Sequence, residues 1–140
     1  MKTGIIILFF NNENEITKEY FRELLNKPTS CFCLVNNASN DKTLHRLVDF
    51  KKAINNKVTV LDIKRNKGVK AAIKAGVRYL KNQQDFNSII YFEFSEYKKQ
   101  KHLKNILNFL NNENSNMQVI SKTTDRKILK NVFSIKEIAY

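Results

Sequence analysis

Three short, continuous apolar runs constrain the fold more than any other feature of this sequence. They are Ile5–Phe10, Cys31–Val35 and Ile89–Phe92. Each run is too short for a typical helix, and none shows the polar–apolar alternation of a strand with one face in water. A sheet that is covered on both faces buries such strands completely. The sequence therefore predicts an α/β fold with a mostly parallel sheet, helices on both faces and Gly4–Phe10 as a central strand.

Segments with helical periodicity separate the apolar runs. Their apolar residues recur at the spacing of one helical face, so each predicts a helix that packs on the sheet. The predicted helices cover Ile16–Leu25, Asp41–Ile54, Val69–Leu80 and Leu103–Leu110, and the remaining predicted strands cover Lys57–Ile63 and Met117–Ser121. Near the end, Ile128, Leu129 and Val132 favour a terminal helix. This succession is typical of repeated βαβ units with right-handed crossovers.

Length and charge limit the classes of function. The chain has 140 residues, so we expect residues 1–140 to form one domain. The formal net charge of +12 favours phosphates, nucleic acid or an anionic membrane surface, so we also expect peripheral contact with the inner face of a membrane. The basic residues are spread along the chain, however, and no nucleic-acid-binding motif accompanies them, so a nucleic-acid partner is not favoured.

The cysteines and the apolar N-terminal run suggest a cellular location. Cys31 and Cys33 are the only cysteines, and at i and i+2 of a strand they share a face and do not bridge each other. Ile5–Phe10 is too short for a membrane span or for the apolar part of a signal peptide. We therefore expect a reduced, cytoplasmic protein.

The stretch Cys33–Thr43 reads C-L-V-N-N-A-S-N-D-K-T and marks the expected site. It describes a buried strand, a tight polar turn and the start of a helix. Ser39 or Asn40 is expected to cap that helix, with Asp41 near the positive end of its dipole. Ligands of open α/β folds bind at such carboxyl ends of parallel strands.

Three motifs in this order resemble those of family 2 glycosyltransferases, which have the GT-A fold. Val35, Asn37, Ser39, Asp41 and Thr43 fit the family's V-D-N-x-S-x-D-x-T. The stretch Phe10–Glu13 is similar to its Y-N-x-E, and Asn66, Gly68 and Gly76 fit its N-x-G-x-x-x-A-x-N-x-G. The resemblance extends over about residues 3–122. It implies a Rossmann-like GT-A domain that binds a nucleotide-diphosphate sugar through Asn11, Glu13, Asn36, Asn37, Ser39, Asp41, Asn66 and Gly68.

The chain departs from the family pattern at two places in this site. Asn36 replaces the aspartate that contacts the nucleotide, so it accepts hydrogen bonds without the assistance of a charge. Glu93-Phe94-Ser95 replaces the D-x-D that holds a divalent metal, and Glu96 follows. The resemblance thus implies Glu93, Ser95 and Glu96 as ligands of Mg²⁺ or Mn²⁺.

The acceptor side of the family is largely missing from the sequence. Inverting members take a general base from a segment beyond the D-x-D, and Asp125 is the only aspartate after Glu93. Glu93 and Asp125 are therefore the candidate catalytic residues, and the chain corresponds to the donor-nucleotide half of the fold. Three interpretations stay open: a glycosyltransferase of weak or no activity, completed by a partner chain that supplies the acceptor site; a non-catalytic nucleotide-binding or regulatory module; and a basic nucleic-acid-binding domain.

Overall fold

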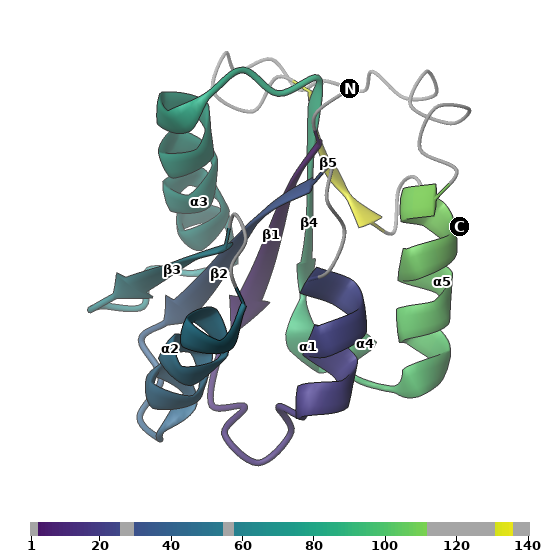
Figure 1. Ribbon diagram of the computed structural model, residues 1–140. Coiled ribbons are helices and arrows are strands. Elements are labelled where there is room, and N and C mark those ends of the chain that lie inside the picture. Colours follow the sequence, from purple (N-terminus) through teal and green to yellow (C-terminus); the bar gives the residue numbers. More distant parts are fainter. Residues whose placement is uncertain (1–2, 26–29, 55–57, 112–130, 136–140) are drawn as a thin grey trace.

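The structure, a computed structural model, is built on one five-stranded sheet and describes residues 3–25, 30–54, 58–111 and 131–135. The strands are β1 (Thr3–Phe9), β2 (Ser30–Asn37), β3 (Val58–Ile63), β4 (Ser88–Glu93) and β5 (Val132–Ser134). They pair in the order β3-β2-β1-β4-β5, and every pair is parallel. The predicted parallel sheet with a central first strand is confirmed (Figure 1).

The helices cover the two faces of the sheet unequally. They are α1 (Lys18–Leu25), α2 (Thr43–Ala53), α3 (Val69–Gln83), α4 (Phe94–Tyr97) and α5 (Gln100–Asn111). Residues of α1, α2, α4 and α5 share one apolar core with one face of the sheet, whereas α3 is the one helix of the described residues that packs on the other face. Among the described residues, no helix is both long and apolar enough to cross a membrane.

An aromatic cluster fastens α1 and α4 to the central strand. The ring of Phe9 lies 5.7 Å from that of Phe21 and 5.0 Å from that of Phe94, between centroids. The hydroxyl of Tyr20 donates a hydrogen bond of 2.6 Å to the backbone carbonyl of Tyr97. This packing fixes the short helix α4 directly behind the end of β4, where the sequence predicts metal ligands.

The other face depends on a close approach between α3 and β1. Gly76 lies against Ile6, and a Cβ atom added at Gly76 would lie only 3.0 Å from the Ile6 Cδ1 atom. Both residues are buried. The small residue therefore lets the helix axis come close to the sheet.

The C-terminal part differs from the sequence-based expectation. Val132 lies in β5, where it pairs with Ile89, so the predicted terminal helix is wrong at this residue. A three-residue edge strand carries too few residues for a recognisable period, which explains the error. The predicted strand Met117–Ser121 lies outside the described residues, as do Ile128 and Leu129 of the predicted helix.

The connection from β4 to β5 contains α4, α5 and residues 112–130, which lie outside the described residues. The expectation that this crossover is right-handed therefore stays a prediction.

We expect Gly76→Leu to destabilise the fold, because the larger side chain must displace Ile6 from a filled core. The free energy of unfolding should fall by about 1–3 kcal/mol, measured by urea denaturation. Arg78→Leu adds the same side chain at an exposed position of the same helix and should change it by less than about 0.5 kcal/mol. Equal effects of the two substitutions would contradict the close approach of α3 to β1.

Candidate functional site

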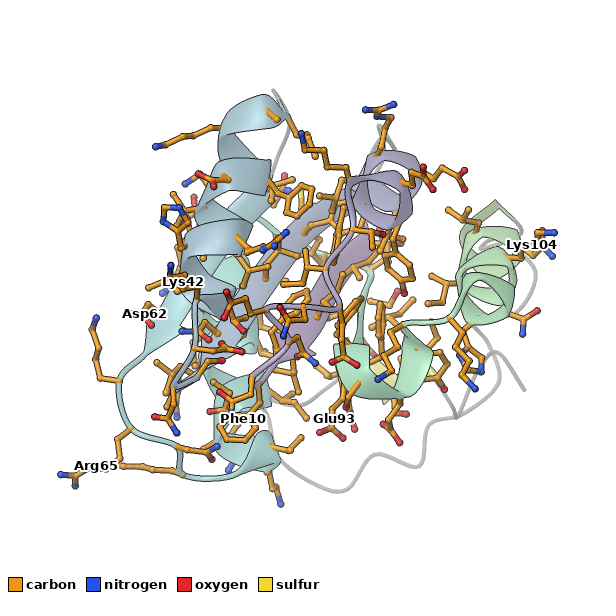
Figure 2. All side chains as sticks on the ribbon, turned by 90° about the horizontal axis from the view of Figure 1, so that it is seen from below. Phe10, Lys42, Asp62, Arg65, Glu93 and Lys104 are labelled. Carbon is orange, nitrogen blue, oxygen red and sulfur yellow. The ribbon has the colours of Figure 1, made fainter. Side chains whose placement is uncertain are left out.

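The register of the sheet brings the polar ends of three strands to one edge. Phe9 of β1 lies opposite Asn36 of β2, Leu8 lies opposite Glu93 of β4, and Asn36 lies opposite Asp62 of β3. Figure 2 looks onto this edge, with Asp62, Phe10 and Glu93 labelled along it. The carboxyl edge is where open parallel sheets bind ligands.

A small cavity opens at this edge on the side of α3. Its volume is about 140 Å³. Its lining comprises Leu8, Phe9, Phe10, Asn37, Asn66, Gly68, Val69, Glu93 and Ser95. Five of these were predicted as site residues, whereas Phe10 and Val69 were not. Phe10 and Val69 are 49% and 39% exposed and are the exposed large apolar side chains of the described chain, so the cavity has an unusually apolar rim.

The N-terminal end of α3 forms one wall of the cavity, through Gly68 and Val69. Gly68 precedes the helix with φ at +96°, a conformation that favours glycine, and its N–H donates to Asn66 Oδ1 at 2.8 Å. Asn66 Nδ2 in turn donates to the Asn37 carbonyl at 3.4 Å, which ties this turn to β2. The first turn of α3 has no acidic residue, so no carboxylate there competes for its N–H groups. Such a helix start favours anions.

Four of the predicted nucleotide-binding residues bind one another instead of facing the cavity. The Asn11 N–H donates to Ser39 Oγ at 2.9 Å, and the Asn40 N–H donates to Asn11 Oδ1 at 2.8 Å. The Glu13 N–H donates to Asp41 Oδ2 at 3.1 Å, and the Lys42 N–H donates to Glu13 Oε1 at 3.2 Å. We call these interlocked turns, residues 11–13 and 39–42, the loop clamp. Its bonds hold the two turns that follow β1 and β2 against each other.

Asp41, rather than Ser39 or Asn40, accepts the side-chain hydrogen bonds at the start of α2, so the predicted cap is wrong. The Thr43 N–H and hydroxyl both donate to Asp41 Oδ1, with the N–H at 2.9 Å. Burial alone would raise the pKa of the Asp41 carboxyl, but the hydrogen bonds from Thr43 and from the Glu13 N–H outweigh it. The pKa of Asp41 is therefore held below its ordinary value of 3.8.

Asn36 lies at the same edge but on the opposite face of the sheet from Asn37, because neighbouring strand residues alternate. Its Nδ2 donates to Asp62 Oδ1 at 3.0 Å, while its Oδ1 is buried and has no partner among the described residues. Asn37 Oδ1 is likewise buried without a partner in the described structure. A buried acceptor without a donor lowers the stability of the folded chain. A ligand that donates hydrogen bonds to these two oxygens would remove that cost.

Asp62 was not predicted as a site residue. A hydrogen bond from Lys64 lowers the pKa of Asp62, burial opposes this, and the bond from Asn36 lowers it further. The carboxylate therefore stays charged and turns the Asn36 amide so that its oxygen faces away. The signal that could have revealed Asp62 is its position at the end of β3, directly opposite Asn36.

The predicted metal ligands are only partly brought together. Glu93 is half-buried and lines the cavity together with Ser95, whereas Glu96 lies on α4 and is not part of the lining. Asp125 lies outside the described residues. Within the described ranges, no group of three or more His, Cys, Asp or Glu could cage an ion. One carboxylate fits Mg²⁺ or Mn²⁺ only if ligand phosphates complete the coordination shell.

The cysteines and His45 do not offer a nucleophile. Cys31 and Cys33 are both buried and free, and burial raises the pKa of the Cys33 thiol to about 12. A thiol of that pKa stays protonated and unreactive at neutral pH. The exposed His45 pairs with Asp49 at 3.5 Å on the surface of α2. Neither the cysteines nor His45 is therefore a candidate for covalent catalysis.

The fold is an α/β fold of the GT-A type. It is similar to two crystal structures of TarS from S. aureus, with a TM-score of 0.51 at 19% identity for residues 1–349 and 0.55 at 18% identity for the longer chain. The match covers 83% of this chain, but 34% and 20% of those chains, so this chain spans about a third or less of their length. Identity this low shows the fold alone. No curated protein sequence matches the chain.

The family follows from the sequence itself. Residues 4–126 match the profile described as Glycosyl transferase family 2. The chain belongs to this family, as the three motifs predicted. Members use nucleotide-sugar donors and often a divalent metal.

We expect Asp41→Asn to lower the free energy of unfolding at pH 7 by up to about 1 kcal/mol, because the clamp loses a charged acceptor. The folded-state pKa of Asp41 is below 3.8, so its contribution is present above pH 3.8 and is lost as the pH falls through the folded pKa. The deficit of the variant should therefore shrink between pH 5 and pH 2 in urea denaturation. Asp49→Asn on exposed α2 is the control. A deficit that is independent of pH would contradict the role of this charge.

Proposed function

We propose that the chain binds a nucleoside-diphosphate sugar at the carboxyl edge of the sheet and transfers the sugar slowly or not at all. The observation that carries the proposal is the combination found at one cavity. A helix start free of acidic residues, an apolar rim and a buried, unpartnered acceptor oxygen on Asn37 all meet there. Membership of the family supplies the class of ligand.

Each part of the site suits one part of such a donor. The N–H groups of the first turn of α3 suit the diphosphate, because they have no partner within the helix and carry the positive end of the helix dipole. The exposed ring of Phe10 offers a flat apolar surface for the base or the sugar. The oxygen of Asn37 would accept a hydrogen bond from an N–H or hydroxyl group of a ligand in the cavity, and the oxygen of Asn36, on the other face, would accept one from a part of the ligand that reaches over the end of β2.

Glu93 and Ser95 are the residues that would hold a divalent metal arriving with the diphosphate. Such an ion neutralises charge that develops on the departing diphosphate. With a single carboxylate the protein contributes less to this than two acidic ligands would, and the loss falls on the transition state more than on ground-state binding.

Activation of the acceptor is the weakest part of the site. Among the described residues, Glu93 is the one carboxylate that lines the cavity, and it is assigned to the metal. Asp125 or a partner chain would have to supply the general base, whose help is typically worth 10²–10⁴-fold. A non-catalytic module that binds a nucleotide sugar is the second candidate, and it shares every binding contact above.

The first test separates binding from transfer. Calorimetry with a panel of nucleoside diphosphates and Mn²⁺ should detect weak binding, and a donor-turnover assay should detect little or none. Glu93→Gln should weaken the Mn²⁺-dependent binding at least about tenfold, because it removes the charged ligand of the ion.

Glu96→Gln is the matched control, since it makes the same change one helical turn away and outside the cavity. It should alter the affinity by less than about twofold. Absence of binding to every nucleotide would refute the proposed function. Brisk metal-dependent transfer by the chain alone would refute the proposed loss of turnover.

The second test concerns the amide at the end of β2. Asn36→Asp restores the residue typical of the family but sets a second carboxylate beside Asp62, so we expect nucleotide affinity to fall about tenfold at pH 7. The double variant Asn36→Asp/Asp62→Asn exchanges donor and acceptor and should recover the affinity. A gain in affinity from Asn36→Asp alone would show that Asp62 does not orient Asn36 in the bound state.

A further inference from the structure

A second, larger hollow lies between α1 and α2, on the opposite face of the sheet from the helix α3. Its volume is about 940 Å³. We call it the α1–α2 groove. One end of the groove is formed by Glu13 and Lys42 of the loop clamp, and the rest runs along the two helices. Figure 2 shows Lys42 at the end of α2 nearest the strand ends.

The rims of the α1–α2 groove carry a regular pattern of positive charge. Lys18 and Arg22 lie four residues apart on α1, and Lys42 and Arg46 lie four residues apart at the start of α2. Each rim therefore shows two cations about 6 Å apart along the helix. All four are exposed, and none has an ion-pair partner among the described residues.

The acidic residues of the groove offset this pattern only in part. Two carboxylates, Glu13 and Asp49, stand in the lining against the four cations. The groove therefore keeps a net positive field, which adds to the +12 charge of the whole chain.

The floor of the α1–α2 groove is apolar and only partly buried. Helix α2 buries only Thr43 and Leu47 completely, whereas α1 buries four of its eight residues. Phe50 and Ile54 of the α2 end are only half-buried, and Ala53 beside them is exposed. Phe50 contacts Phe21 with ring centroids 5.2 Å apart, so the floor is the open edge of the main core.

We propose that the α1–α2 groove docks an acidic amphipathic helix of a partner protein. An apolar stripe of that helix covers Phe50, Ala53 and Ile54, and acidic residues one turn apart on each flank pair with the four rim cations. The pairing of two cations with i, i+4 spacing on both rims is what a helix lying in the groove would need.

The shape of the groove favours this occupant over other anionic partners. Small-molecule sites enclose a few convergent polar groups, whereas these four cations are all exposed and stand on separate rims. A membrane surface would be met by protruding apolar side chains, and here the apolar side chains form the floor. The proposal does not rest on nucleotide binding at the strand ends.

The test uses a labelled synthetic peptide with a leucine stripe flanked by glutamates at i, i+4 spacing, followed by fluorescence anisotropy. We expect saturable binding that weakens as salt rises from roughly 0.1 M to 0.5 M, and no binding of the same peptide with lysines in place of glutamates. Arg22→Glu/Arg46→Glu should reduce the affinity at least about tenfold, because attraction becomes repulsion at both rims.

Arg78→Glu/Lys104→Glu is the control, with the same change of charge at exposed positions on α3 and α5. It should leave the affinity within about twofold, and circular dichroism should show both variants folded. Absence of peptide binding, or equal loss in the two variants, overturns the proposal. Binding to phosphatidylserine vesicles or a DNA duplex in preference to the peptide, lost in Arg22→Glu/Arg46→Glu, also overturns it. Loss of nucleotide binding at the strand ends would leave the expected peptide result unchanged.

Discussion

The hydrogen-bonded ladders on both sides of β1 are the constraint on which the rest of the structure depends. All seven residues of this strand are buried, and its partners β2 and β4 run parallel to it over almost its whole length. Parallel pairing places every strand end at one edge, so the apolar core and the polar site are set by the same register. A slip of one residue would turn Asn37 and Glu93 away from the cavity that they share.

In the loop clamp, residues of a family motif stabilise the fold by hydrogen bonds to one another. Asn11 and Glu13 follow β1, and Ser39 and Asp41 follow β2. Their hydrogen bonds join the turn after β1 to the turn after β2. The turns that follow the lining residues Phe10 and Asn37 are thereby held in place before any ligand arrives, which reduces the entropy cost of binding. The acceptors left over, on Asn36 and Asn37, are buried without partners in the described structure.

The sequence predicted the fold well because continuous apolar runs have few other solutions, and it located the strand ends because polar residues follow each run directly. It could not predict that the Asp41 carboxylate accepts the Glu13 N–H and that the Glu13 carboxylate accepts the Lys42 N–H, since both bonds depend on two turns meeting in space. Asp62 escaped notice because a single acidic residue at the end of a half-buried strand resembles an ordinary surface position. The three-residue β5 was too short to leave a periodic signal.

The central claim is that a metal-bound nucleoside diphosphate lies at the carboxyl edge of the sheet, against α3. The most direct measurement is an NMR titration of the isotope-labelled chain with a nucleoside diphosphate, first with Mg²⁺ and then with trace Mn²⁺. The account predicts shifts at the amides of Phe10, Asn37 and Gly68, and paramagnetic broadening centred on Glu93 and Ser95. Changes confined to the α1–α2 groove, or broadening spread over exposed carboxylates with no centre at Glu93, would contradict it.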